Sequence, residues 1–154
     1  KGWKHQIKND ILLNYQLDFE KKLFASNNFL LNNTAGIKAG TVHNKINGGV
    51  NFMAGHFNNP YQEKRKKKVE YYLYGQSKMS IIGYDASLQG GLFNRKNPYT
   101  ISPGDVSRIT FQSDAGLVIN LKKLYFHYNQ SFITREFRIG KMHRWGGISI
   151  GFAF

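Results

Sequence analysis

The chain has 154 residues, of which 41% are hydrophobic and 15% aromatic, and it contains no cysteine. The absence of cysteine excludes a disulfide framework and a thiolate zinc site, and the aromatic content is atypical of a disordered protein. The 22 basic residues exceed the 9 acidic ones by 13, and this formal charge of +13 is typical of proteins with a polyanionic partner, either nucleic acid or a phosphate-bearing membrane surface. The length fits one domain over residues 1–154, and because the first residue is Lys1 we expect this domain to be N-terminally incomplete.

Strict alternation of apolar and polar residues recurs along the chain and predicts about seven β-strands with two different faces. In chain order, the alternating segments lie at about residues 11–20, 29–40, 50–55, 69–86, 108–121, 124–132 and 148–154. Short polar stretches between them are typical of hairpin turns, namely Ser26–Asn28, His43–Lys45 and Lys122–Lys123. Longer connections are expected at residues 58–68 and at about 88–105.

Strand length and face chemistry favour a particular all-β fold, an antiparallel transmembrane β-barrel. Several segments exceed the 5 or 6 residues that are about the mode for soluble strands, and they reach the roughly 9–11 residues that cross a bilayer at a tilt. One face is aliphatic and aromatic, and the other carries small neutral polar residues, as expected for a lipid-facing wall around a hydrated lumen. A soluble β-sandwich or lipocalin-like barrel, with the apolar face inward, is the alternative.

A nucleic-acid-binding barrel fits less well, because its stacking aromatics would alternate with Lys and Arg rather than with neutral polar residues. We therefore expect no nucleic-acid partner. The period-2 pattern also predicts which residues share a face. The residues expected to face lipid are Phe111, Leu117, Ile119, Ile148, Ile150 and Phe152. The residues expected to face the lumen are Arg108, Gln112, Asp114, Asn129 and Ser149.

Short motifs follow one another along the chain in a recognisable order. They are Gly2-Trp3-x-x-Gln6, a glycine-rich hairpin around residues 35–55, Tyr71-Tyr72-Leu73-Tyr74-Gly75, Asp85-Ala86-Ser87-Leu88-Gln89-Gly90-Gly91, Thr134-x-Glu136-Phe137 and His143-x-Trp145-Gly146, followed by a strand that ends on Phe154. Their order and spacing resemble the C-terminal half of the outer-membrane lipid A deacylases, the LpxR-like family. The resemblance covers nearly the whole chain.

This resemblance implies a bacterial outer-membrane barrel of roughly 12 strands that removes the 3′-acyloxyacyl group from lipid A. Its expected partners would be outer-membrane lipid and lipopolysaccharide. Other outer-membrane proteins are a further class of possible partner. The implied chemistry is calcium-dependent ester hydrolysis in which a histidine acts as the base for water. That histidine and the early Asn and Asp residues of the family precede the Gly-Trp element, so they have no counterpart here, and His5 does not match the base. No catalytic residue or calcium ligand is carried over.

Glu136 and His143 form the best local acid/base pair by composition, because a glutamate can orient a histidine for general-base work. A structural role for both residues in organising the last hairpin is the favoured interpretation, since residues in one loop carry no guarantee of catalytic geometry. No pair of histidines has the spacing of metal ligands, so no metal site is predicted. Asp85 could help to hold an ion or substrate near the outer rim, but a turn-forming role beside Gly90 and Gly91 is the favoured interpretation.

Two basic clusters are candidates for contact with phosphates. If the C-terminus is periplasmic, the 58–68 loop is periplasmic too, and the loops at 88–105 and 135–143 face outward. The candidate phosphate-binding residues for lipid A are therefore Arg135, Arg138, Lys141 and Arg144. The more highly charged run, Glu63–Lys68, is expected to be a solvated loop.

Two functional hypotheses remain open. The first is a lipid A deacylase barrel, present here as its C-terminal portion. The second is a non-catalytic barrel that serves as a structural or docking subunit of an outer-membrane complex. Under either hypothesis, seven strands are not expected to close a barrel, because single-chain bacterial barrels have an even strand number and open strand edges in lipid are costly.

Overall fold

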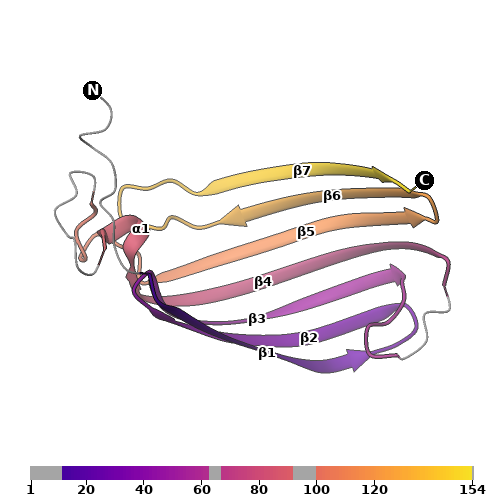
Figure 1. Cartoon of the computed structure of the whole chain (residues 1–154), viewed down its shortest axis with the longest axis horizontal. Helices are drawn as coiled ribbons and strands as arrows, with labels where there is room; N and C mark the ends of the chain where they lie inside the picture. Colours follow the sequence, from indigo (N-terminus) through magenta and orange to yellow (C-terminus); the bar gives the residue numbers. More distant parts are fainter. Residues whose placement is uncertain (1–11, 63–66, 92–99, 154) are drawn as a thin grey trace.

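The computed structural model describes residues 12–62, 67–91 and 100–153. Within these ranges seven strands form one antiparallel sheet in which each strand pairs with the next one along the chain, in the order β1-β2-β3-β4-β5-β6-β7 (Figure 1). The elements are β1 (Asn14–Ala25), β2 (Phe29–Gly40), β3 (His43–His56), β4 (Val69–Asp85), α1 (Ala86–Gln89), β5 (Ile109–Leu121), β6 (Leu124–Ile133) and β7 (His143–Phe152). The predicted all-β antiparallel fold with seven strands is therefore confirmed.

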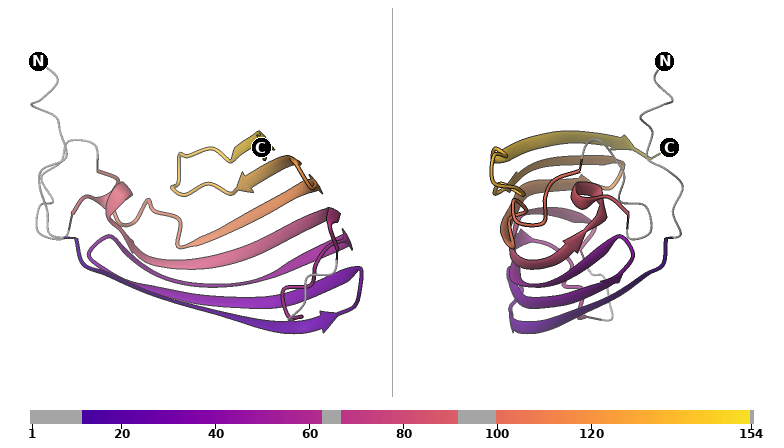
Figure 2. Two further views of the ribbon diagram at one scale, coloured as in Figure 1. Left: turned by 45° about the vertical axis from the view of Figure 1, so that its right-hand side comes forward. Right: turned by 90° about the vertical axis from the view of Figure 1, so that its left-hand side faces the viewer.

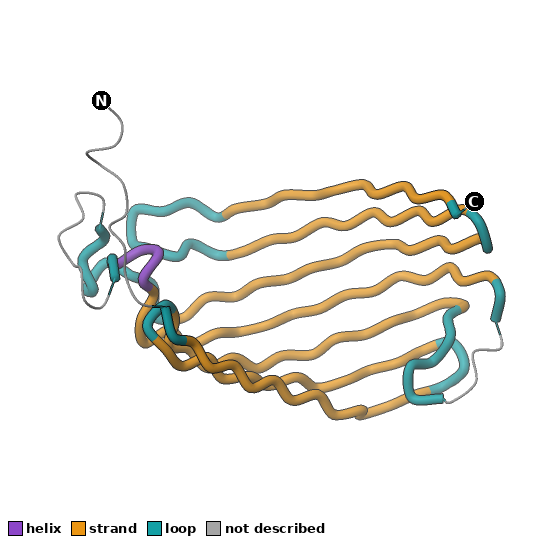
Figure 3. The backbone as a smooth tube through the Cα atoms, viewed as in Figure 1, coloured by secondary structure: helices purple, strands orange, loops and turns teal. Residues whose placement is uncertain are grey.

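The strands have 10 to 17 residues, and the long ones run the full length of the sheet (Figure 3). The last strand begins earlier than predicted, at His143 instead of residue 148. The predicted hairpin turn at His43–Lys45 is wrong, because these residues already belong to β3 and Lys45 pairs with Lys38. The turn lies at Thr41–Val42 instead.

One face of the sheet is apolar and exposed. The register aligns a row of aliphatic residues across five strands, and their exposed fractions are 46–62%: Leu17, Ile37, Ile46, Ile81 and Ile109. Among the described residues, the buried hydrophobic side chains are Leu30, Phe57, Ile82, Val106 and Val118. Among the described residues, the apolar face is therefore left uncovered, as a lipid-facing wall would be, which contradicts the alternative of a soluble barrel with that face inward.

The predicted division between the two faces is confirmed on β5 to β7. Phe111, Ile148, Ile150 and Phe152 are 40–67% exposed on the apolar face, and the register places Leu117 opposite Tyr128 and Ile119 opposite Phe126 on that same face. Gln112, Asp114, Asn129 and Ser149 point to the other side. Arg108 lies just before β5 and donates to the carbonyl oxygens of Gly83 (2.6 Å) and Pro103 (2.8 Å).

The polar face is the concave one. A single cavity is lined by polar-face side chains from six strands, from Gln16 on β1 to Ile133 on β6, which requires those side chains to converge. The sheet curves as part of a barrel wall does (Figure 2). It is not closed, since β1 and β7 are the two edges of the strand order and do not pair with each other in the part of the chain that is described.

The two ends of the sheet differ. The turn between β2 and β3, α1, residues 100–108 and the β6–β7 loop lie together at one end, which we call the α1 end (Figure 1). The β1–β2, β3–β4 and β5–β6 connections lie at the opposite end. At the opposite end the β3–β4 loop folds onto the concave face, where Phe57 is 1% exposed and its ring lies 5.8 Å from that of Tyr72.

Glycine allows one close contact on the concave face. Gly116 lies beside Tyr74, and a Cβ at this position would approach the Tyr74 ring to 2.6 Å. The ring leans over this glycine, and a hydrogen bond of 2.8 Å joins the Tyr74 hydroxyl to Nε2 of His127. In the described ranges, no helix has the length and apolar character that a membrane span requires.

Candidate functional site

The predicted phosphate-binding residues lie on or beside the β6–β7 loop at the α1 end. Arg135, Arg138, Lys141 and Arg144 are all exposed. Arg138 makes an ion pair with Asp105, in which Nη1 and Oδ1 are 3.8 Å apart. Both side chains are largely exposed, so solvent screens this pair and leaves the guanidinium accessible to another anion.

The backbone of this loop is held by residues 105–107. The amide of Arg138 donates to the carbonyl of Asp105 (2.7 Å), and the amide of Ser107 donates to the carbonyl of Glu136 (2.9 Å). An isolated bridge joins Val106 to Phe137, and Val106 is 4% exposed. The basic side chains therefore project from a fixed backbone. Lys67 and Lys68 lie at the opposite end of the sheet, and residues 63–66 of the Glu63–Lys68 run are outside the described residues.

Glu136 and His143 are not brought together as an acid/base pair. Among the described residues, no hydrogen bond or ion pair joins their side chains. Glu136 instead lines the concave cavity, where its negative charge acts on Lys45. His143 begins β7 and is exposed. These two residues therefore do not have the geometry that general-base catalysis requires in this chain.

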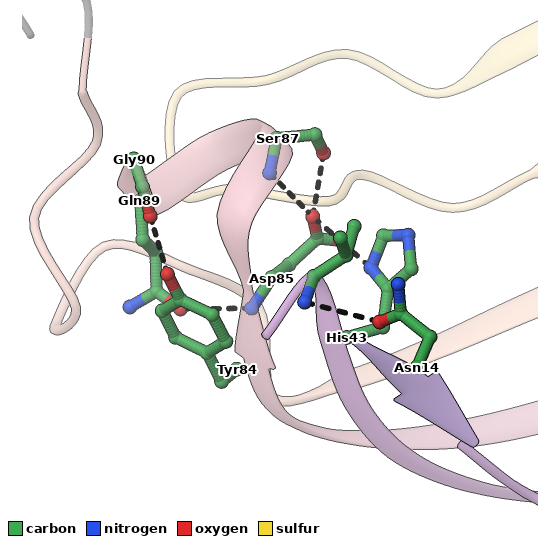
Figure 4. A network of polar contacts seen from close by, with 8 residues as sticks. Asn14, His43, Tyr84, Asp85, Ser87, Gln89 and Gly90 are labelled. Atoms are coloured by element: carbon green, nitrogen blue, oxygen red, sulfur yellow. Dashed lines mark hydrogen bonds and ion pairs between the residues drawn. The ribbon is translucent and has the colours of Figure 1, made fainter. Parts of the chain in front are cut away.

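Asp85 is at the centre of a polar network at the α1 end (Figure 4). It is the N-cap residue of α1, and its Oδ1 accepts hydrogen bonds from the amide of Ser87 (2.9 Å) and the hydroxyl of Ser87 (2.5 Å). Gln89 accepts from the amide of Asp85 (3.1 Å), and the Tyr84 hydroxyl donates to the carbonyl of Gly90. Asp85 therefore has a local structural role, as predicted, but it caps a short helix where a turn was expected.

The same network contains the residue types of a hydrolase triad in the wrong order. Nδ1 of His43 lies 3.4 Å from Oδ1 of Asp85, and Ser87 contacts that same oxygen. In a triad the histidine lies between the serine and the carboxylate, because it must take the proton from the hydroxyl. Here the carboxylate lies between the other two, so the geometry supports helix capping and not nucleophilic catalysis.

Three lysines that the sequence did not single out converge on the concave face. Lys38, Lys45 and Lys78 come from β2, β3 and β4, and all three line a cavity of about 140 Å³ near the α1 end. Each is separated from the others by at least one strand connection, so only the register reveals their proximity. The one usable signal in the sequence was a lysine at a polar-face position on each of three consecutive strands.

The resemblance implies calcium, and the described residues do not fit this ion. Calcium needs six or more oxygen ligands, usually with several carboxylates. Within residues 12–62, 67–91 and 100–153, no group of three or more His, Cys, Asp or Glu side chains could hold a metal ion. We therefore assign calcium no ligand among these described residues and derive no chemical step through it.

The comparisons with known proteins agree with this fold. The family model described as "Outer membrane protein LpxR" matches residues 1–154. Among solved structures, LpxR from Salmonella typhimurium is similar, with a TM-score of 0.70 and 17% sequence identity, which shows the fold alone. The match covers 99% of this chain and 55% of that one, so the chain spans about half the length of that protein. No curated protein matches the chain.

The family match extends over the full length of the chain, and the structure independently has the exposed apolar wall and polar concave face of a membrane barrel. The predicted outer-membrane location is confirmed by this match. The chain therefore belongs to the LpxR family of outer membrane proteins.

Proposed function

We propose that this chain forms part of the wall of a lipid A deacylase, an outer-membrane barrel that hydrolyses the ester of the 3′-acyloxyacyl chain of lipid A. The family match over residues 1–154 is the observation that carries this proposal. The exposed apolar face supports it further, because a substrate with acyl chains in the outer leaflet reaches such an enzyme laterally from the lipid phase. Outer-membrane lipid and lipopolysaccharide are then its partners.

In this proposal the α1 end faces outward and the loop cluster Arg135, Arg138, Lys141 and Arg144 binds the phosphates of lipid A. Its position on a loop held by residues 105–107 supports this role, since a fixed backbone keeps the charges at one place on the rim. Charge-assisted contacts from arginine to phosphate are strong and directional. These four basic residues would position the substrate. The groups that cleave the ester would lie outside the described residues.

We propose further that additional strands pair with β1 and β7 to complete the barrel. The support is physical: an unpaired backbone group in lipid costs several kcal/mol, about the cost of a lost hydrogen bond in an apolar medium, and both edges of the sheet are open. The share of LpxR from Salmonella typhimurium that this chain covers, 55%, leaves room for such strands. The base that activates water would come with them.

The test is the acylation state of lipid A. The natural protein that contains this chain is expressed in a bacterium whose lipid A carries a 3′-acyloxyacyl group, and lipid A is analysed by mass spectrometry. Loss of the mass of that group is expected. Heat-modifiable migration in gel electrophoresis checks that the barrel is folded.

A non-catalytic structural or docking barrel is the second candidate, and one observation favours it. In the described residues, the best acid/base pair by composition, Glu136 and His143, is not joined by any hydrogen bond or ion pair. A folded, outer-membrane-inserted protein that leaves lipid A intact would support this candidate and contradict the deacylase proposal.

A further inference from the structure

Beyond the deacylase function, we propose that Lys38, Lys45 and Lys78 form an anion-binding site on the concave wall of the barrel, and that its ligand is a phosphate group. The register places Lys38 directly opposite Lys45 on β2 and β3. Lys78 on β4 pairs with Gly49, four residues along β3 from Lys45, and its side chain lines the same cavity. The positive charges of Lys38 and Lys78 both act on the Lys45 ammonium.

These ammonium groups have no local partner of opposite charge in contact with them. Across the described ranges, none of the three makes a hydrogen bond or an ion pair. Like charges directly opposite one another on one face of a sheet destabilise the pairing. All three side chains are half-buried, so water screens this repulsion less than at an open surface. An anion between them would remove the repulsion.

The acidic residues that line the same cavity differ in whether they are free to pair with a lysine. Asp18 accepts a hydrogen bond from Gln16, and Asp85 is engaged by Ser87 and faces His43. Glu136 has no such partner in the described part of the chain, and the charges of Asp85 and, more weakly, of Glu136 attract Lys45 from beyond contact distance. A bound anion would therefore compete with both carboxylates for Lys45, and Glu136 is the one whose side chain makes no hydrogen bond among the described residues.

The size and lining of the cavity suit a phosphate group. Its volume is about 140 Å³, well above the roughly 10–15 Å³ that a single water needs, so it accommodates an ion of five heavy atoms. Neutral donors complete the lining, among them Asn47 and the buried hydroxyls of Ser80 and Thr110. A Cβ on Gly36 would lie 2.7 Å from Asp18 and 2.9 Å from Asn47, so glycine leaves space for the side chains that converge there.

The site differs from the exposed arginines of the β6–β7 loop. Its lysines sit on strands and point into the concave side, and the β3–β4 loop covers that side at the opposite end with Phe57 and Tyr61. Both inorganic phosphate and the phosphorylated headgroup of a lipid carry the chemistry that this site would recognise.

The test is calorimetric titration of inorganic phosphate into the natural full-length protein, held in non-ionic detergent and phosphate-free buffer. The variant K38Q/K45Q/K78Q should bind phosphate at least tenfold more weakly. The matched control is K21Q/K68Q/K123Q, which removes three exposed lysines outside the cavity and should bind as the unmodified protein does. E136Q should bind severalfold more tightly, because it removes a competing carboxylate.

The source of the phosphate group is identified by competition between inorganic phosphate and micelles of phosphorylated lipid A. Competition that is lost in K38Q/K45Q/K78Q identifies a lipid headgroup, and phosphate binding without competition identifies free phosphate; both outcomes support the site. Equal phosphate affinity of the triple variant and the control would overturn it, as would the absence of binding to the unmodified protein. If the triple variant does not fold, unchanged affinity in the single variant K38Q overturns the proposal equally.

Discussion

Tyr61, in the loop between β3 and β4, donates a hydrogen bond of 2.9 Å to Oε1 of Glu20 on the concave face of β1. The two residues are 41 positions apart in the chain. Glu20 also accepts from the side-chain amides of Asn32 (2.7 Å) and Asn51 (3.2 Å). This carboxylate therefore connects three neighbouring strands to a loop that lies across the end of the sheet.

Replacing Tyr61 with Phe should lower the free energy of unfolding by about 0.5–1 kcal/mol, because the loop loses one hydrogen bond to a carboxylate in a partly solvated setting. The loss should appear in urea denaturation of the protein in lipid vesicles. Tyr71→Phe is a suitable control, since Tyr71 lies on the exposed apolar face. Equal effects of the two substitutions would show that the contact with Glu20 contributes nothing.

The hydrogen bond between Tyr61 and Glu20 also predicts that the stability of the protein depends on pH in the alkaline range. Burial, then the hydrogen bond to Glu20 and its negative charge, raise the pKa of Tyr61 above its ordinary value of 10.0. The stabilisation is therefore fully present below about pH 10 and is lost as the pH rises through the folded-state pKa. The difference in unfolding free energy between the unmodified protein and Y61F should shrink in that range. A difference that is constant from about pH 8 to about pH 12 would contradict this.

The two faces of β7 should respond differently to a charge. Ile150→Arg should destabilise the protein in a bilayer by roughly 2–4 kcal/mol if residue 150 lies near the midplane, since the arginine would enter hydrocarbon. Ser149→Arg, on the neighbouring concave-face position, should cost much less because its side chain meets the hydrated side. Urea titrations in vesicles measure both. Similar costs would mean that the apolar face does not contact lipid.

The capping role of Asp85 predicts a stability effect that separates capping from catalysis. Asp85→Ala should cost about 1 kcal/mol, the usual value for loss of an N-cap, and Asp85→Ser should recover much of it because a hydroxyl can accept the same bond. Ser87→Ala and His43→Ala should leave lipid A deacylation intact. A loss of deacylation in S87A, with the fold retained, would show that the Asp85 network takes part in the reaction.

The loop cluster predicts a difference between the two ends of the barrel. Neutralising Arg135, Arg138, Lys141 and Arg144 together with Gln should weaken binding of phosphorylated lipid A by tenfold or more, as expected for the loss of several phosphate contacts. Neutralising Lys64, Arg65, Lys66, Lys67 and Lys68 should have a smaller effect, because the described members of this run, Lys67 and Lys68, lie at the opposite end. Binding is measured with lipid A in micelles and with its dephosphorylated form as a control. Equal or reversed effects would mean that the barrel is inserted with the α1 end facing inward.

The sequence determined the strands and the chemistry of their two faces. Successive side chains of a strand point to opposite sides whatever the strand pairs with, so the alternation around Ile148, Ser149 and Ile150 is a local property of the backbone. The same holds for Phe111 and Gln112 on β5. The strand lengths and the order of the motifs could also be read from the sequence. They predicted the barrel class and the family.

Only the tertiary structure decided which residues of different strands meet. The pairing of Lys38 with Lys45 depends on a turn at Thr41–Val42, and a shift of one residue would turn each side chain to the other face. The same register sends Glu136 toward Lys45 and away from His143, and brings His43 to Asp85 across β3 and β4. These contacts form between segments far apart in the chain, and their geometry is set by turn positions and strand pairing together, which no local pattern encodes.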